Sequence, residues 1–96
     1  VAGCPVAPAA LEGLNAPGAV TAAGESFSSW EDTIAASLWQ RGVARERSHA
    51  LATFAIAAIE GALIVAKAQR SITALDRTEQ ELLALLEAVV EVSAGH

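Results

Sequence analysis

The sequence predicts an all-α protein, a single domain built as a bundle of about four helices. Alanine is the commonest of its 96 residues, aromatic residues make up only 4% and tyrosine is absent, so the composition favours helices over a β-sheet. The segment from Ala50 to Gln69 has no proline, one glycine and only two charged residues. Its length far exceeds that of an ordinary strand, and it therefore predicts a long central helix.

Helical periodicity and chain-breaking residues divide the chain into four expected helices. Their expected ranges are 6–14, 17–40, 45–70 and 74–92. Gly42 has the position of a glycine that ends a helix, and Thr73 has the chemistry of an N-cap. The sequence contains no internal repeat and no long linker, so we expect residues 1–96 to form one domain.

The central helix is expected to be apolar on two sides. At about 100° per residue, one apolar row consists of Leu51, Phe54, Ala55, Ala58, Ala62 and Val65. A second row consists of Ala52, Ile56, Ile59, Leu63 and Ala66. A helix that is apolar almost all round is buried on more than one side, and a chain of 96 residues can hardly cover both rows. We expect the first row to face this chain's other helices and the second to face another copy.

The other long helices have simpler apolar faces. In the helix at 17–40, the expected core row is Val20, Ala23, Phe27, Trp30, Ile34 and Leu38. In the helix at 74–92, it is Leu75, Leu82, Leu86 and Val89. Trp39 lies off its row, where it is expected to cover a partner or the mouth of a pocket.

Two sets of residues are candidate binding residues. The candidate ligand-binding residues are Phe27, Trp30, Leu51 and Phe54, which are core residues on the plainest interpretation and also a natural wall for an apolar molecule. The candidate dimer interface consists of Ile56, Ile59, Glu60, Leu63, Leu83 and Val90.

Glu60 and Gly61 stand out within the central helix. On the plainest interpretation Glu60 is an exposed residue on the narrow polar stripe of this helix. The functional alternative places its carboxylate at the edge of a dimer interface or a ligand cavity. Gly61 favours that alternative, because a glycine within a helix costs stability and often permits close approach of another helix or a ligand.

The charge and the reactive residues exclude several functions. A net charge of −5 argues against nucleic-acid binding by these residues, since phosphate contacts need clustered lysine and arginine. The nearest basic cluster, at residues 41–47, is diluted by Glu46 and is expected to be a solvated turn.

Catalytic and metal-binding residues are scarce. Cys4 is the single cysteine, so an internal disulfide is excluded and a small buried residue is expected. The sequence has two histidines, His49 and His96, far apart, and no HExxH, CxxC or glycine-rich phosphate loop. We expect no enzyme, no metal and no cofactor. The one catalytic alternative has Cys4 as a nucleophile and His49 as its base.

The chain resembles the C-terminal half of TetR-family transcriptional repressors, most closely the LmrA-like, multidrug-responsive branch. The resemblance covers residues 3–86 and is carried by GCPVAPAALEGL, SFSSWEDTIAASL and ALATFAIAAIEGALIVAKAQRS, followed by a leucine-rich helix. Its main markers are Gly3-Cys4-Pro5, Trp30, and Glu60-Gly61-Ala62-Leu63 with Lys67 and Arg70 following.

This resemblance implies an all-α domain that binds a ligand and dimerises. In the family, the last two helices pair with their copies around a two-fold axis to form a four-helix bundle. The family's helix-turn-helix lies at the N-terminus, and residues 1–96 do not match it. DNA contact is therefore expected only through an N-terminal domain outside this sequence.

The resulting expectation is a cytoplasmic regulatory domain that forms a homodimer and binds a small, mostly apolar effector. One alternative is a stand-alone helical interaction module without a ligand. Another is a membrane segment at 50–66, which is shorter than the roughly 20 apolar residues of a span and contains Glu60. The chain begins with Val1 and lacks methionine, so we also expect it to be a fragment of a longer protein or a processed chain.

Overall fold

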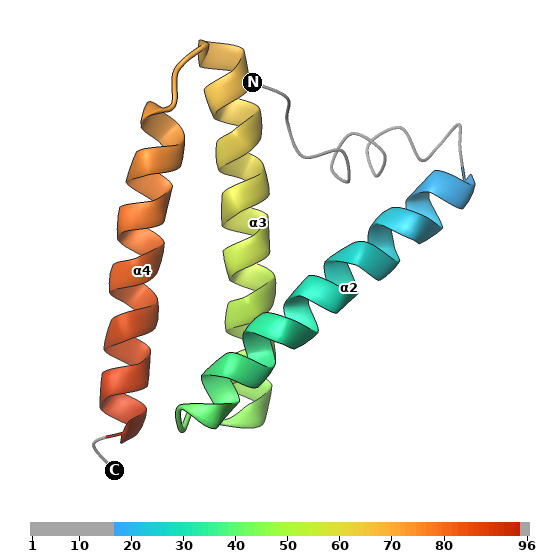
Figure 1. The fold of residues 1–96 in the computed structure, drawn as a ribbon. Helices are drawn as coiled ribbons and strands as arrows, with labels where there is room; N and C mark the ends of the chain where they lie inside the picture. Colours follow the sequence, from blue (N-terminus) through green and yellow to red (C-terminus); the bar gives the residue numbers. More distant parts are fainter. Residues whose placement is uncertain (1–16, 95–96) are drawn as a thin grey trace.

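The computed structural model describes residues 17–94, and these form three helices and no strand (Figure 1). Helix α2 spans Pro17–Gln40, α3 spans Arg45–Gln69 and α4 spans Thr73–Ala94. The predicted all-α fold is confirmed, and the three helices begin and end within two residues of their expected ends. The helix expected at residues 6–14 lies outside the described residues, as do Cys4 and His96.

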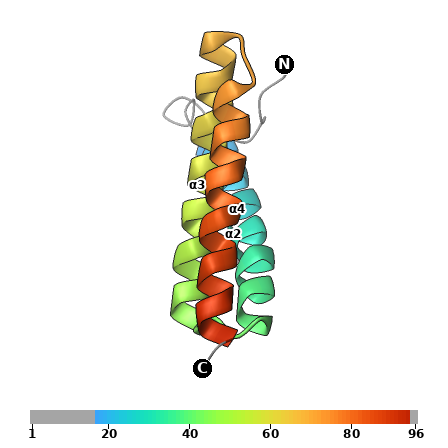
Figure 2. The same ribbon diagram turned by 90° about the vertical axis from the view of Figure 1, so that its left-hand side faces the viewer.

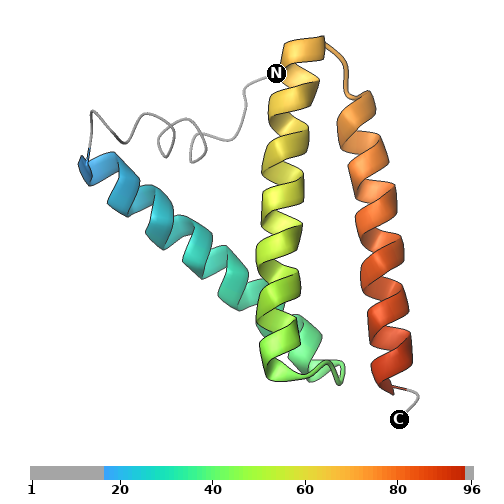
Figure 3. The same cartoon turned by 180° about the vertical axis from the view of Figure 1, so that it is seen from behind.

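Helices α3 and α4 form an antiparallel hairpin, and α2 crosses one side of it. α2 packs against the N-terminal half of α3 and diverges from it toward Pro17 (Figure 1). When α4 faces the viewer, α2 lies on one side of the hairpin (Figure 2). From behind, α2 leaves the other side of the hairpin uncovered (Figure 3). The hairpin therefore has one partly covered side and one free side.

The hydrophobic core lies where the three helices meet. Its buried residues are Leu38, Val43 and Leu51, and the partly buried residues around them are Ile34, Leu86, Val89 and Val90. Leu82 is also buried and Leu75 is half-buried, so the expected core row of α4 is confirmed. Burial of these aliphatic side chains stabilises the packing of the three helices. Each fully buried side chain contributes about 1.5–3 kcal/mol to the free energy of folding.

Gly42 ends α2 as expected. It has a φ of 99°, a left-handed conformation that glycine adopts without strain. Its N–H donates to Trp39 O at 3.0 Å, and the N–H of Val43 donates to Leu38 O at 3.1 Å. This pair of bonds is a Schellman motif, and it turns Val43 into the core.

The turn between α3 and α4 repeats that motif with an arginine in place of glycine. Arg70 has a φ of 53°, and its N–H donates to Lys67 O at 3.3 Å. The N–H of Ser71 donates to Ala66 O at 3.1 Å. The expectation of Thr73 as an N-cap is wrong. Thr73 is the first residue of α4, and its own N–H donates to Ser71 Oγ at 3.2 Å.

Burial along α3 follows a stripe drawn from both predicted rows. The buried residues are Ser48, Leu51, Ala52, Ala55, Ala62 and Ala66. Ala52 and Ala66 were expected to face another copy but are buried within this chain. Phe54 and Val65 were expected to face this chain's helices but are exposed. The crossing of α2 explains the difference at Ala52, because small side chains let two helices approach closely.

The aromatic residues are more exposed than predicted. Trp30 is 40% exposed and Phe54 is 53% exposed, so the prediction that both are core residues is wrong. Ala23 and Leu38 are buried on the same row of α2, whereas Val20 is exposed. The divergence of α2 from α3 is consistent with the exposure of Val20 and Trp30, but it does not explain the burial of Ala23.

Helix α3 leaves much of its apolar surface uncovered. By length and composition it could cross a membrane, and only 28% of its most apolar window is buried in this structure. The core helix of a soluble protein passes the same test, so this property is weak evidence for a membrane span. The low burial shows that α3 has apolar surface that the described residues do not cover.

Candidate functional site

The four candidate ligand-binding residues lie in three different environments. Phe27 and Trp30 form an edge-to-face pair on α2, with ring centroids 5.6 Å apart and an interplanar angle of 82°. Leu51 is buried in the core against Leu38 and Val43. Phe54 points toward α4 instead. The structure therefore brings Phe27 and Trp30 together but does not place all four around one of the main cavities of residues 17–94.

Phe54 lines a groove between α3 and α4 of about 470 Å³, here called the Phe54 groove. Ala58 lines it from α3, and Arg77, Thr78, Glu81, Leu82 and Leu85 line it from α4. The walls combine apolar side chains with one basic and one acidic residue, Arg77 and Glu81. This composition suits a protein surface better than a dry cavity for a small apolar molecule.

Two candidate dimer residues line a second groove between the same helices, here called the Ile59 groove. Ile59 and Leu83 are 42% and 51% exposed, and the groove has a volume of about 470 Å³. Leu83 and Leu86 also line an adjoining groove in which α4 faces α2. The Ile59 groove therefore lies on the side of the hairpin where α2 crosses.

The remaining candidate dimer residues lie beside or beyond this groove. Val90 lines the adjoining groove between α4 and α2, and Leu63 lines a cavity of about 330 Å³ near the α3–α4 turn. Ile56 is half-buried. The candidate residues that line cavities are thus divided among three of them and do not form a single compact patch.

Glu60 has a carboxylate oxygen without a partner. Its side chain is half-buried, and Oε2 is inaccessible to solvent yet accepts no hydrogen bond. A buried acceptor without a donor costs free energy, typically about 1–3 kcal/mol. Glu60 was expected to be exposed on the plainest interpretation, but its side chain is half-buried. Its Oε2 atom is buried and has no hydrogen-bond donor among the described residues.

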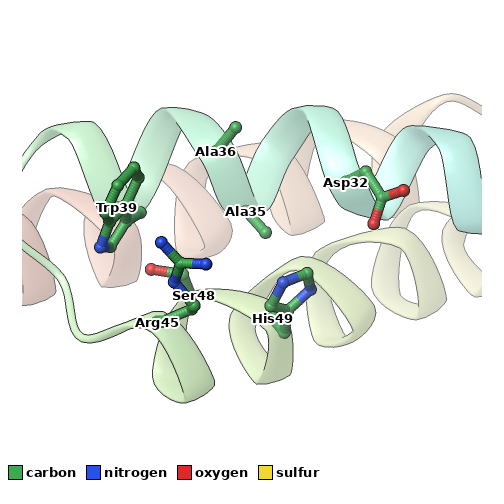
Figure 4. Close-up of a pocket in the computed structure, with 7 residues that line it drawn as sticks. All are labelled: Asp32, Ala35, Ala36, Trp39, Arg45, Ser48 and His49. Atoms are coloured by element: carbon green, nitrogen blue, oxygen red, sulfur yellow. The ribbon is translucent and has the colours of Figure 1, made fainter.

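The sequence did not predict a pocket between α2 and α3, here called the crossing pocket (Figure 4). Its volume is about 270 Å³. Helix α2 contributes Asp32, Ala35, Ala36 and Trp39, and α3 contributes Arg45, Ser48 and His49. The residues of α2 lie one and two turns apart on one face, and so do those of α3.

The two ends of the crossing pocket differ in charge. At one end the guanidinium of Arg45 lies over the ring of Trp39, with its central carbon 4.4 Å from the ring centroid. Asp32 lies at the opposite end, and His49 lies on the α3 side (Figure 4). The floor contains Ala35 and Ser48, both buried, and Ser48 Oγ donates to Val43 O at 3.3 Å.

The sequence predicted one residue of this pocket, Trp39. Trp39 was expected to cover a partner or a pocket mouth, and it lines the crossing pocket while half exposed. Nothing in the sequence singled out Asp32, Ser48 or the stacking of Arg45. Within residues 17–94, no group of three or more His, Cys, Asp and Glu side chains could hold a metal ion.

Comparison with known proteins identifies the family. Residues 1–81 match the model of the C-terminal domain of LmrA/YxaF-like transcriptional regulators. The chain is 33% identical, over 92 residues, to two HTH-type transcriptional regulators of Mycobacterium tuberculosis, MT0206 of strain CDC 1551 / Oshkosh and Rv0196 of strain ATCC 25618 / H37Rv.

Each alignment covers 88% of this chain and 47% of the relative, so the chain spans about half the length of these curated relatives. No solved structure gives a significant match. The family match and the all-α fold agree with each other. The chain belongs to the LmrA/YxaF-like branch of the TetR-type transcriptional regulators and matches their C-terminal domain.

Proposed function

We propose that this chain is the effector-binding and dimerisation domain of a TetR-type repressor. In this proposal a separate helix-turn-helix domain of the same protein contacts DNA, as the names of the two relatives suggest. The protein acts in the cytoplasm, needs no cofactor and performs no catalysis. The negative charge of residues 1–96 fits this division of labour, because another part of the protein then supplies the phosphate contacts.

The uncovered apolar surface of the α3–α4 hairpin carries the proposal. Ile59 on α3 and Leu83 on α4, which line the Ile59 groove, are 42% and 51% exposed. Contiguous apolar surface of this kind usually marks an interface. A second copy is the proposed cover, packed along Ile56, Ile59, Glu60, Leu63, Leu83 and Val90.

A small apolar effector is proposed to bind where α2 diverges from α3. Phe27 and Trp30 supply an aromatic pair with half-buried and exposed rings. Phe27 and Trp30 carry this proposal, because Leu51 is buried in the core and Phe54 faces α4. In this proposal the effector completes the packing between α2 and α3 and so changes the angle between them.

Regulation follows from unequal binding to two arrangements of the dimer. An effector that prefers one angle between α2 and α3 shifts the population toward that arrangement. If that arrangement spaces the two DNA-binding domains wrongly for the operator, DNA is released. Linkage then requires operator DNA to lower the affinity for the effector by the same factor.

The test uses the full-length protein with DNA from upstream of its own gene. Apolar compounds are screened for those that raise the melting temperature, and each hit is titrated with and without operator DNA. The proposal expects a hit whose affinity falls when DNA is bound. A hit with unchanged affinity in the presence of DNA, while DNA binding is intact, overturns the regulatory mechanism.

Two alternatives have distinct outcomes in the same preparation. A stand-alone interaction module neither binds operator DNA nor yields an effector, although it remains a stable assembly. A membrane span at α3, favoured by its length and apolar composition, requires detergent to stay in solution. A full-length protein that is monodisperse without detergent excludes the membrane span.

A further inference from the structure

We propose that the crossing pocket binds a small zwitterion, a molecule with a carboxylate at one end and an ammonium group at the other. The site is separate from the proposed effector site, since none of Phe27, Trp30, Leu51 and Phe54 lines it. The proposal rests on the charges of the pocket, the contact of its arginine with Trp39 and the small, buried residues of its floor. It does not depend on the regulatory mechanism proposed above.

The crossing pocket holds opposite charges that do not neutralise each other. Asp32 and Arg45 line the same cavity, one from each helix, yet neither forms an ion pair with any residue in the range 17–94. Figure 4 shows them at opposite ends, with the alanines of α2 between them. A ligand with the reverse arrangement of charges can satisfy both ends at once, which a singly charged ligand cannot.

Arg45 is held in position before any ligand arrives. Its guanidinium lies 4.4 Å from the centroid of the Trp39 ring, a cation–π contact that restricts the long side chain. The guanidinium forms no ion pair within residues 17–94, so its N–H groups are available to the two oxygens of a carboxylate. The entropy cost of ordering the side chain is then reduced when the ligand binds.

The floor of the crossing pocket consists of small, buried residues. Ala35 and Ser48 are 3% and 1% exposed, and the hydroxyl of Ser48 already donates to Val43 O. Both residues lie on helices that pack directly against each other. The ligand therefore meets small side chains that leave room for a short methylene chain, with charged groups at the two ends and His49 on one wall.

The helix geometry sets the length of the ligand. The Arg45 guanidinium lies over Trp39, which is seven residues from Asp32 on α2, so the rise of about 10 Å between these two residues along the helix axis approximates the separation of the two charged ends. Each charged hydrogen bond takes up roughly 2.8 Å of that distance. The remainder fits a carboxylate and an ammonium group separated by a few methylenes, so the class is a short ω-amino acid.

The experiment measures binding to the full-length protein by tryptophan fluorescence and calorimetry. Residues 1–96 contain two tryptophans, and a fluorescence change that persists in Trp30→Phe but is lost in Trp39→Phe comes from Trp39 beside the site. The probes are glycine, 4-aminobutanoate, 6-aminohexanoate and 8-aminooctanoate. Butanoate and butylamine serve as single-charge controls. Binding is expected to be tightest for 4-aminobutanoate, and weaker for each single-charge compound by about three- to tenfold.

Two variants connect the result to the site. Asp32→Asn and Arg45→Gln are each expected to weaken binding of the best zwitterion by about three- to tenfold. Glu25→Gln and Arg41→Gln remove exposed charges outside the pocket and are expected to leave it unchanged. Circular dichroism checks that all four variants fold.

Several results overturn the proposal. These are no binding of any zwitterion, equal binding of the single-charge compounds, and full binding by both Asp32→Asn and Arg45→Gln. A wild-type protein that binds no operator DNA or no effector would instead contradict the regulatory proposal. The ω-amino acid titration can still be measured on such a protein. The two failures are therefore distinguishable.

Discussion

Thr53 of α3 and Glu31 of α2 are joined by a hydrogen bond at the point where the two helices begin to diverge. The Thr53 hydroxyl lies 2.7 Å from Glu31 Oε2 and 3.2 Å from the His49 carbonyl oxygen, and its single proton can serve only one of them at a time. Ala52 and Ala55 are buried beside Thr53 on α3. This bond connects the close-packed part of the crossing to the part that opens.

Replacing Thr53 with valine tests that contact. Thr53→Val keeps the shape of the side chain and removes the donor, and we expect the free energy of unfolding to fall by about 0.5–1.5 kcal/mol. Urea denaturation measures the change. Thr33→Val is the matched control, because Thr33 bonds only within its own helix, to Ser29 O. Equal effects of the two variants would show that the bond between helices contributes nothing.

The closeness of α2 and α3 predicts intolerance of larger side chains at Ala52. This residue is fully buried, so Ala52→Leu must push the helices apart, and we expect a loss of about 1–3 kcal/mol in unfolding free energy. Ala57→Leu adds the same atoms at an exposed position of the same helix and should be nearly neutral. Similar denaturation midpoints for both would contradict the packing described for the crossing.

The proposed dimer face predicts which charge substitution produces a monomer. Ile59→Lys places a cation in the Ile59 groove, where burial by a second copy is unfavourable, so we expect the molar mass in light scattering to halve. Val65→Lys is a close control, since Val65 is 43% exposed, nearly the same as Ile59, but lies on a different face of α3. Dissociation by Val65→Lys alone would place the second copy on the side of the Phe54 groove.

The unpartnered oxygen of Glu60 predicts a gain in stability on its removal. Glu60→Gln keeps the length of the side chain and replaces the charged carboxylate with a neutral amide, which costs less to bury without a partner, so the expected gain in unfolding free energy is about 1 kcal/mol. Glu87→Gln changes an exposed glutamate of α4 and should have no effect. If Glu60→Gln instead destabilises the full-length dimer, a donor from the second copy or from an effector satisfies this oxygen.

The left-handed arginine at the end of α3 predicts a stabilising glycine. Arg70 has a φ of 53°, so Arg70→Gly relieves the strain of a side chain in that conformation, and a gain of about 1 kcal/mol is expected. Gln69→Gly, one residue earlier in the helix, should lower stability by a similar amount. Thermal denaturation of both variants provides the comparison. A loss of stability in Arg70→Gly would show that the arginine side chain contributes contacts that outweigh the strain.

The sequence by itself determined the local structure. Helix ranges could be predicted because alanine-rich periodic segments, breaker residues and Gly42 act through neighbours a few positions apart. The same local logic predicted the core row of α4. The family resemblance was also readable, because the markers around Trp30 and Glu60 lie within continuous stretches.

Only the tertiary structure decided which apolar residues are buried. The crossing and divergence of α2 bury Ala52 and leave Trp30 and Phe54 exposed, and this arrangement depends on how two helices meet, which periodicity within one helix does not specify. The crossing pocket has the same origin. Asp32 and Arg45 are separated by a helix end and a turn in the sequence, and the packing of α2 against α3 brings them to one cavity.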